Sequence, residues 1–393
     1  MNLRTNWNAN EGWRRRLRAR YRRERLFRML ALGAMLLSGA FLVFFFQDVL
    51  RGGFRAFQQA HLQVGVHYSE EAAAFGDVAV DGDVQFLVSR GYLRVIPRRI
   101  VERPELLGRR IEEWVPATSD VDQYLKGRPN RLAPEEIATV ERLRAEGRTR
   151  LGFNTGFLLN GDSQLPEMAG IRAAVVGTIY MLLITMLVSV PIGVMTAVYL
   201  EEFASDNRLT RLIEVNISNL AAIPSILFGL LGLAVFVNFV GVPRSSALAG
   251  GLTLALMMLP IVIISTRAAL RAVPDGIRHG ALAVGASRWQ TVRYHVLPQA
   301  LPGILTGSIL GLAQAMGETA PLLIIGMVAY IPDPPGGLTD AATALPVQVF
   351  SWFSMSQRGF EEKAAAAILV LLAVLMLLNA TAIYLRNRYE KRW

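Results

Sequence analysis

Apolar residues are gathered into six long runs along the chain, at positions 26–46, 173–200, 217–240, 247–265, 303–331 and 364–385. A helix that crosses the hydrocarbon core of a bilayer needs about 20 apolar residues. The runs therefore predict an all-α membrane protein with six transmembrane helices. Two of the loops after the second run are long, and the one that follows the fifth run is expected to contain a short re-entrant or interfacial helix carrying Trp352 and Phe353 at the headgroup level.

The stretch 47–172, between the first and second runs, has a different pattern from the rest of the chain. Acidic and basic residues are mixed there, and turn signals such as Asp81-Gly82-Asp83 recur. Positions 78–88 alternate and 91–96 are rich in β-formers, which predicts two short strands around that turn. A helix is predicted to begin at Pro134. We expect a small extracytoplasmic α+β domain inserted between the first and second membrane helices.

Composition supports the membrane assignment. The chain has 393 residues, of which 52% are hydrophobic and 18% charged, whereas soluble proteins carry about 25% charged residues. It has no cysteine, which excludes disulfides and thiol-bound metal. His61 and His67 lack further ligands at metal-site spacing, so they are interpreted as surface residues and no metal site is expected.

The net charge of +10 is concentrated beside the membrane runs. Arginines crowd the N-terminal segment 1–25, and Arg386, Arg388, Lys391 and Arg392 lie in the C-terminal segment 386–393. The positive-inside rule predicts that both segments are cytoplasmic, with anionic lipid rather than nucleic acid as their partner. The first run is interpreted as a retained anchor, and a cleaved signal peptide is the alternative.

The inside loop 268–299 contains a motif, HGALAVGASRWQTVRYHVLP, at 279–298. It resembles the cytoplasmic coupling loop of ATP-binding cassette (ABC) importer permeases. Ala281, Gly285, Leu297 and Pro298 match the family pattern with its spacing, whereas His279, Gly280 and His295 depart from it. Small residues let a short helix enter a partner's groove, Gly285 is expected to end that helix, and Pro298 to begin the next span.

Three further segments indicate a more specific family of permeases. Residues 219–232, 270–275 and 315–323, together with Tyr199 to Phe203, are similar to the PstA family of phosphate permeases, and the domain at 47–172 resembles an N-terminal extension found in one branch of that family. The resemblance implies a type I ABC importer permease fold over 173–385 in the bacterial inner membrane. It also implies a second permease like PstC, a dimeric ATPase like PstB that binds ATP and Mg, and a binding protein like PstS.

The fifth run carries the candidate conduction residues. Glu318 lies near its middle beside Gly317 and Pro321, which predicts a broken helix around a functional carboxylate. The alternatives are a structural ion pair and a span whose boundary is drawn wrongly. Gln314, Thr319 and Arg267 complete the candidate path, although Arg267 at a span end is also typical of a topology marker. Glycines and alanine recur at every fourth position, which predicts a helix interface with a second chain or within this one, at Gly303, Gly307, Gly311 and Ala315.

The absence of a Walker A motif indicates that this chain is not itself an ATPase. Its lysines, Lys126, Lys363 and Lys391, never follow a glycine. We therefore expect a permease that imports inorganic phosphate using a separate ATPase and binds no cofactor itself. The alternatives are an ABC permease for molybdate or sulfate, a secondary transporter, or a membrane-anchored sensor built on 47–172.

Overall fold

The computed structural model describes residues 10–327 and 330–389, so Arg4, Lys391 and Arg392 of the predicted basic segments lie outside the described residues. The chain divides into two compact units, one ending at Arg51 and the other beginning at Gly52. The first unit consists of helix α1 (Asn10–Ala56), which continues a few residues into the second. Its portion Arg15–Ala56 is long and apolar enough to cross a membrane, in agreement with the first predicted span.

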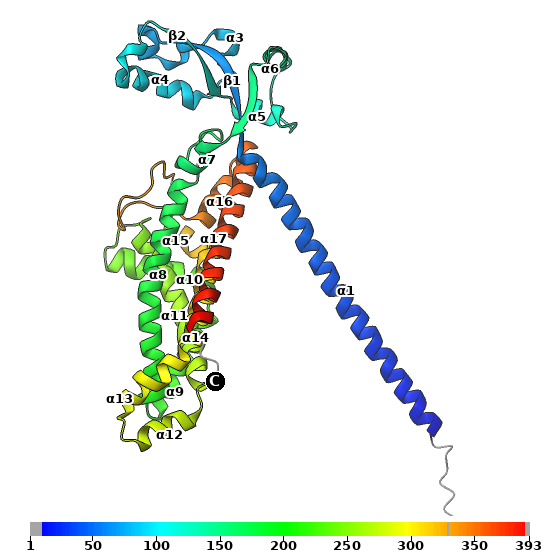
Figure 1. Ribbon diagram of the computed structural model, residues 1–393, viewed down its shortest axis with the longest axis vertical. Coiled ribbons are helices and arrows are strands. Elements are labelled where there is room, and N and C mark those ends of the chain that lie inside the picture. Colours follow the sequence, from blue (N-terminus) through cyan, green and yellow to red (C-terminus); the bar gives the residue numbers. More distant parts are fainter. Residues whose placement is uncertain (1–9, 328–329, 390–393) are drawn as a thin grey trace, which may run out of the picture. The chain divides into compact units, whose positions relative to one another are not determined.

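Residues 58–159, which we call the α+β segment, begin the second unit (Figure 1). Three antiparallel strands pair in the order β2-β1-β3: β1 (Gln58–His67), β2 (Arg110–Pro116) and β3 (Thr149–Phe153). Helices surround this sheet, and 3-10 turns at Gly76–Ala79 and Pro104–Leu106 connect them: α2 (Glu70–Ala74), α3 (Gly82–Gln85), α4 (Arg90–Glu102), α5 (Ser119–Leu125), α6 (Pro134–Ala145) and α7 (Thr155–Leu159). Leu62, Val64 and Val66 of β1 are fully buried in its core.

The two strands predicted around Asp81-Gly82-Asp83 are wrong. Helices α3 and α4 occupy that stretch instead. In α4 the buried residues Leu93, Ile96 and Ile100 are three or four positions apart, so the helical period presents them together to the sheet. Packing against the sheet thus overrides the β propensity of this stretch. The helix predicted to begin at Pro134 is confirmed as α6.

Four helices in the rest of the second unit are long and apolar enough to cross a membrane (Figure 1). They are α8 (Arg172–Val198) with its π-helical extension Tyr199–Phe203, α11 (Ala247–Arg271), α14 (Leu297–Gly317) with the short turns before it, and α17 (Gly359–Tyr389). Helix α11 packs against both α8 and α14. At one crossing, Thr185 donates a hydrogen bond of 3.0 Å to the carbonyl oxygen of Gly251.

The predicted span 217–240 is not a straight helix. Helix α9 (Arg208–Ala221) meets α10 (Ser225–Gly232), which continues as the π-helical segment Leu233–Phe239, at an angle of 105°. Pro224 lies at this bend, where it has no N–H to donate and disfavours helical geometry in the residue before it. The described helices therefore number five that can cross a membrane, or six if the bent pair counts as one span.

The span predicted at 303–331 also has different bounds. Its helix, α14, begins earlier, at Leu297, and stops at Gly317, and a separate short helix, α15 (Ala320–Ile324), packs against α10. At the α10–α15 contact Gly229 lies directly against Pro321, where a Cβ would come within 2.7 Å of the proline Cα. Residues 328–329 of the predicted span are not described.

The short helix predicted after the fifth span is confirmed as α16 (Leu345–Phe353), but the expected place of Trp352 is wrong. Its side chain is fully buried and its Nε1 donates to Asp162 Oδ1 at 2.9 Å, whereas Phe353 is exposed. The indole therefore satisfies its polar group inside the protein rather than at a headgroup.

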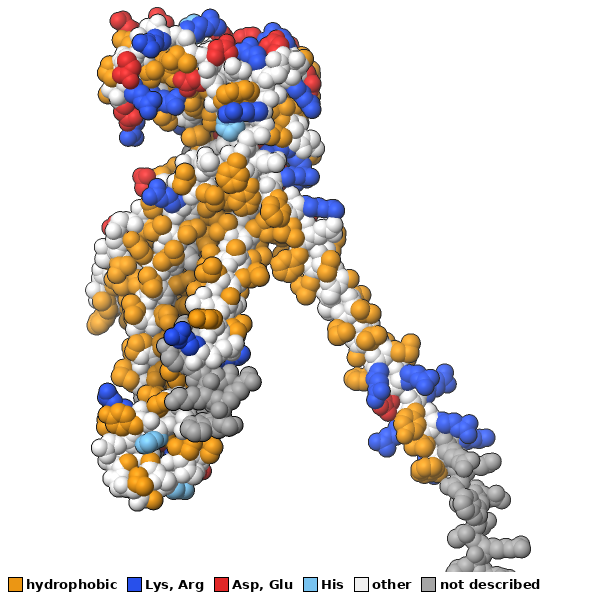
Figure 2. All heavy atoms as spheres, in the orientation of Figure 1, with side chains coloured by type: hydrophobic (Ala, Val, Ile, Leu, Met, Phe, Trp, Pro, Cys, Tyr) orange, Lys and Arg blue, Asp and Glu red, His pale blue; other side chains and the backbone are white. Residues whose placement is uncertain are grey.

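Buried ion pairs join the α+β segment to the first turns of α17. Lys126 Nζ lies 2.6 Å from Asp122 Oδ2 and 3.1 Å from Glu362 Oε2. Figure 2 shows the corresponding contrast in surface chemistry: charged side chains crowd the α+β segment, and hydrophobic side chains cover the long helices. The α+β segment and the membrane-compatible helices α8, α11, α14 and α17 thus belong to one compact unit.

Candidate functional site

The loop between α11 and α14 is built from two short helices. Helix α12 (Asp275–Ala283) begins after Pro274, and α13 (Arg288–Thr291) begins at a capping box formed by Ser287 and Gln290. A π-helical segment, Val292–Val296, leads into α14, whose first turn contains Pro298 as predicted, directly after Leu297. The resemblance to a coupling loop thus falls on a compact helix-turn-helix element.

Gly285 separates the two short helices. Its φ is +88°, a conformation that side-chain-bearing residues rarely adopt. The backbone N–H of Gly285 bonds to Leu282 O and that of Ala286 to Ala281 O, which satisfies carbonyls at the end of α12. The prediction that Gly285 ends this helix is confirmed.

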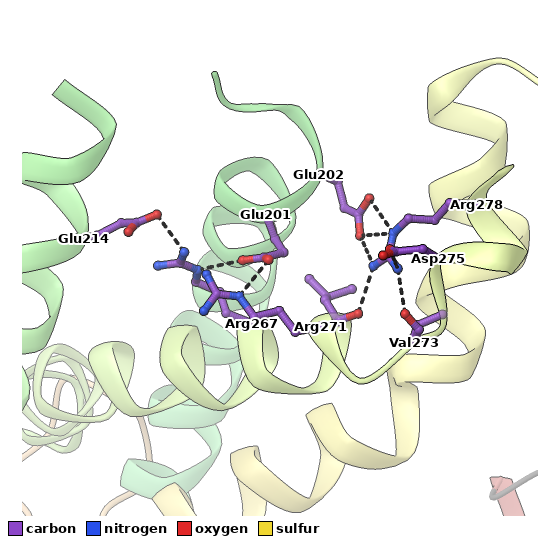
Figure 3. A network of polar contacts seen from close by, with 9 residues as sticks. Glu201, Glu202, Glu214, Arg267, Arg271, Val273, Asp275 and Arg278 are labelled. Atoms are coloured by element: carbon purple, nitrogen blue, oxygen red, sulfur yellow. Dashed lines mark hydrogen bonds and ion pairs between the residues drawn. The ribbon is translucent and has the colours of Figure 1, made fainter. Parts of the chain in front are cut away.

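Arg278 fixes α12 to the neighbouring helices (Figure 3). Its Nη2 donates to Glu202 Oε1 at 2.7 Å and to Leu270 O at 2.9 Å, and its Nη1 donates to Val273 O at 2.7 Å. A further bond from Nη1 to Asp275 spans 3.2 Å. Hydrogen bonding to Glu202 raises the pKa of Arg278 against the opposing effect of partial burial, so the guanidinium stays charged.

A second ion-pair group lies beside the first (Figure 3). Arg267 Nε is 3.1 Å from Glu201 Oε2, and its Nη2 is 2.6 Å from Glu214 Oε1 of α9. Arg271 Nε is 2.7 Å from Glu201 Oε1. Together the two groups link α8, α9, α11 and α12 at one end of the bundle. The sequence analysis did not identify the carboxylates of Glu201, Glu202 and Glu214, or Arg278, as part of a site. A usable signal was present, because acidic residues at the end of one predicted span are followed by arginines in a later loop on the same side.

The outward face of the loop carries apolar side chains. Leu282 is 48% exposed, Val284 84% and Trp289 56%. Of the predicted motif residues, His279 and Gly280 are also exposed, whereas Ala281 is buried against the protein. Exposed apolar side chains that cluster on a rigid element are typical of a protein interaction surface.

The predicted helix break at Glu318 is confirmed. Helix α14 ends at Gly317, Glu318 has extended backbone, and α15 starts at Ala320. Glu318 lies at the end of α14, however, and not at its middle. The backbone N–H of Glu318 donates to Ala315 O, but within the described residues its carboxylate has no hydrogen-bond or ion-pair partner, so the alternative of a structural ion pair has no support among them. The side chains of Glu318 and Thr319 are half-buried, and that of Gln314 is exposed.

Arg267 and Glu318 are not brought together. Gly303 of α14 faces Ala269 of α11, near Arg267. Glu318 is fifteen residues further along, which at 1.5 Å per residue places it roughly 20 Å away. The predicted path residues therefore fall into two groups, with Arg267 in the ion-pair network and Gln314, Glu318 and Thr319 at the helix break.

The small-residue stripe packs within the chain. A Cβ added at Gly303 would meet Ala269, one at Gly307 would collide with Ser265, and one at Gly311 would meet Met258, and all three neighbours belong to α11. Ala315 is buried in the same bundle. Of the two readings of the stripe, these contacts favour the interface inside one chain.

Comparison with known proteins identifies the family. Residues 189–393 match the family model of the binding-protein-dependent transport system inner membrane component. The chain belongs to this family. Its members are transport permeases embedded in a membrane rather than enzymes. Residues 14–85 match a separate domain of unknown function, DUF3333.

The relatives confirm the PstA resemblance. The chain is 37% identical over 177 residues to a probable ABC transporter permease, YqgI of Bacillus subtilis, covering 45% of this chain and 59% of that one. It is 37% identical over 163 residues to the phosphate transport system permease PstA 1 of Mycobacterium tuberculosis, covering 41% and 53%. With PstA of Mycobacterium leprae the identity is 34% over 230 residues, covering 57% and 74%. The chain thus spans little more than half the length of the first two relatives.

A solved structure of the methionine ABC transporter MetNI is also similar. The identity is 18% and the TM-score 0.44, over 56% of this chain and 96% of that one.

Proposed function

We propose that this chain is a transmembrane subunit of an ATP-driven importer of inorganic phosphate. It forms half of the translocation path and passes the work of a separate ATPase to the membrane helices through the loop 279–298. Family membership and the similarity to PstA permeases support this proposal. The observation that carries it is the loop itself, in which Arg278 holds α12 rigidly while Val284 and Trp289 remain exposed.

A loop that transmits force must be held firmly to its own helices and must present a surface that binds its partner. Arg278 holds the loop in place, because it donates hydrogen bonds to Glu202 beside α8 and to two carbonyl oxygens at the end of α11. Leu282, Val284 and Trp289 supply the apolar contact. Because the exposed His279 stands where the resembled loop pattern has a carboxylate, the ATPase contact depends on these apolar side chains rather than on an acidic group at that position.

The proposal includes a place in the bacterial inner membrane and a set of partners. Both termini and the loop 279–298 are cytoplasmic, where anionic lipids meet the basic ends, and the α+β segment is extracytoplasmic. A second permease like PstC completes the path, a dimeric ATPase like PstB binds ATP and Mg, and a binding protein like PstS delivers phosphate. The fold is that of a type I importer permease, with six crossings if α9 and α10 act as one span.

The helix break at Glu318 is the part of the path that this chain contributes. A carboxylate accepts a hydrogen bond from a protonated phosphate oxygen. Sulfate carries no proton at neutral pH, so it cannot donate this bond. Positive charge for the anion comes from the second permease. Arg267 cannot supply it, because it lies about 20 Å from Glu318 and is neutralised by two adjacent carboxylates.

The test is ATP turnover by the chain purified with its partner subunits and reconstituted in vesicles. Phosphate with its binding protein should stimulate turnover, whereas sulfate and molybdate should not. Stimulation by molybdate alone would reassign the substrate, and phosphate uptake without any ATPase would refute the ABC assignment in favour of a secondary transporter.

A matched pair of variants tests the coupling surface in the same assay. Val284→Asp places a charge on the exposed loop, and Val101→Asp places one at a similarly exposed valine of the α+β segment, 78% exposed. Val284→Asp should weaken assembly with the ATPase about tenfold or more, and Val101→Asp should not. Because the chain has no cysteine, Val284→Cys also gives a single label whose accessibility from the cytoplasm checks the orientation.

A further inference from the structure

A pocket of about 340 Å³ lies where the α+β segment meets the start of α17. Its wall includes the first residues of α5, the loop at Leu165 to Glu167, Gln357 and Arg358 immediately before α17, and Gly359 at the start of that helix. This pocket belongs to neither the coupling loop nor the helix break, so the proposed transport function gives it no role.

Three arginines line the pocket: Arg90, Arg131 and Arg358. Within residues 10–327 and 330–389 none of them forms an ion pair, and all three are exposed. They come from three segments far apart in the sequence, and the fold brings them to one cavity. Each guanidinium carries five N–H donors in a planar arrangement suited to phosphate oxygens.

The carboxylates that line the pocket already have hydrogen-bond donors of their own. Asp120 Oδ1 accepts from the backbone N–H of Arg131 at 3.2 Å, and Glu136 Oε2 accepts from that of Ala133 at 2.7 Å. Glu167 Oε1 accepts from Ser89 Oγ at 2.9 Å. These bonds hold the acidic groups to the protein, which leaves the guanidinium donors available to a ligand.

Gln123 adds an independent indication of a ligand. Its side chain lines the pocket and is only 3% exposed, and its amide nitrogen Nε2 has no hydrogen-bond partner among the residues that the structure describes. A buried donor without an acceptor costs free energy, so such a group normally has a partner, which can be a bound water or anion when the protein supplies none. An oxyanion in the pocket would supply the acceptor.

We propose that this pocket binds a phosphate-bearing anion through Arg90, Arg131, Arg358 and the amide of Gln123. Two sources share this chemistry: free inorganic phosphate, and the headgroup of an anionic lipid. The second is available because α17 enters its apolar stretch a few residues after Gly359.

The pocket is mechanically connected to α17. Gly359 is packed so closely that a Cβ there would collide with Ser119 and meet Pro166 at 2.7 Å. One turn further along, Glu362 is bound to Lys126 of the α+β segment inside the protein. An anion bound across Arg90, Arg131 and Arg358 therefore ties the α+β segment to the last membrane helix.

The full chain, purified alone in nanodiscs, tests the proposal without any ATPase, so the result is independent of the proposed transport function. In neutral phosphatidylcholine nanodiscs, equilibrium dialysis measures binding of radiolabelled inorganic phosphate. In nanodiscs that contain phosphatidylglycerol, native mass spectrometry measures retained anionic lipid. Arg90→Gln, Arg131→Gln and Arg358→Gln should each weaken binding about tenfold in one of the two arms, and the arm identifies the source.

The control is Arg109→Gln, which removes an exposed arginine of the same segment outside the pocket and should bind as wild type does. Gln123→Leu removes the unpaired donor, so it should weaken binding without lowering the unfolding temperature. The proposal is overturned if all three pocket variants bind both probes with wild-type affinity, or if Arg109→Gln weakens binding as much as they do.

Discussion

Arg278 and Glu202 form a close ion pair although they are 76 residues apart in the sequence. The Nη2 atom of Arg278 lies 2.7 Å from Glu202 Oε1, and its Nε lies 3.2 Å from the same oxygen. The Glu202 residue is only 8% exposed. The pair therefore joins the loop helix α12 to the end of α8 at a place where an unpaired carboxylate would be poorly solvated.

Removing the arginine should loosen this junction. Arg278→Ala leaves Glu202 buried without its cation, and we expect a loss of about 3 kcal/mol in the free energy of unfolding. Arg278→Lys should retain little of this stability, because a single ammonium group cannot bond to Glu202 and to both carbonyl oxygens at once. Thermal unfolding of the purified chain measures the effect.

Two further variants control this measurement. Arg293→Ala removes an exposed arginine of the same loop, which stacks on Tyr294 and should change stability little. The double variant Arg278→Ala, Glu202→Ala removes both charges and should recover part of the loss. Equal stability of the double variant and Arg278→Ala would contradict the pairing.

Gly285 should tolerate no side chain. Gly285→Ala forces a Cβ into a backbone with φ of +88°, which costs about 1 kcal/mol or more and shifts the angle between α12 and α13. We expect lower ATP turnover in the assembled transporter, with Leu282 and Trp289 misplaced relative to each other.

The matched control is Gly280→Ala in the same loop. Gly280 lies inside α12, and in the part of the chain that the structure describes nothing lies within 4 Å of an added Cβ. Alanine favours helix by up to about 1 kcal/mol over glycine, so this variant should be as active as wild type and no less stable. Loss of activity in both variants would show that the loop is sensitive to bulk rather than to backbone conformation.

Local signals in the sequence were sufficient for the loop but not for its attachments. The turn at Gly285, the start of α14 at Pro298 and the helix break at Glu318 each depend on a few adjacent residues, and all three were predictable. The Arg278–Glu202 pair depends on the packing of segments distant in sequence. The bend at Pro224 was missed because a run of apolar residues indicates only that a segment is hydrophobic. It does not show where the helix changes direction within that segment.

The α+β segment shows the same limit. Its predicted strands failed because Leu93, Ile96 and Ile100 lie on one face of α4 in a core shared with the sheet, and local β propensity does not report such packing. The pocket arginines could not be grouped from the sequence either, since Arg90, Arg131 and Arg358 belong to three separate segments.

The contact between α11 and α14 should be sensitive to one methyl group. A Cβ at Gly307 would collide with the side chain of Ser265, so Gly307→Ala should destabilise the chain by about 1 to 3 kcal/mol. Gly317→Ala is the control, because no atom of the described residues lies within 4 Å of a Cβ there. If the double variant Gly307→Ala, Ser265→Gly does not regain stability, the collision is not the cause.

The α+β segment should lose order in acid through Glu113. Hydrogen bonds from Tyr68, Tyr92 and Arg99 outweigh the effect of burial and lower the pKa of Glu113 below the 4.5 typical of glutamate. A lowered folded-state pKa means that the stabilisation is present above that ordinary value and is lost as the pH falls through the folded pKa.

The protection of backbone amides near Tyr68 from hydrogen exchange should therefore decrease in wild type as the pH falls below 4.5 and through the folded-state pKa of Glu113. In Glu113→Gln the exchange should be faster already at neutral pH and should change less with acidification. Glu112→Gln, at the exposed neighbouring position of β2, should keep the wild-type pH profile. A wild-type profile in Glu113→Gln would remove this carboxylate as the cause.

Glu318 provides the most direct test of the conduction path. The carboxylate follows the end of α14, is half-buried and has no partner among the described residues. Glu318→Gln keeps the shape of the side chain but replaces one acceptor oxygen with a donor, so it should discriminate less between protonated phosphate and sulfate. We expect phosphate uptake into vesicles to fall about tenfold or more, with expression and ATPase assembly unchanged. Glu135→Gln, an exposed glutamate of α6, should transport normally, and undiminished uptake in Glu318→Gln would exclude the carboxylate from the path.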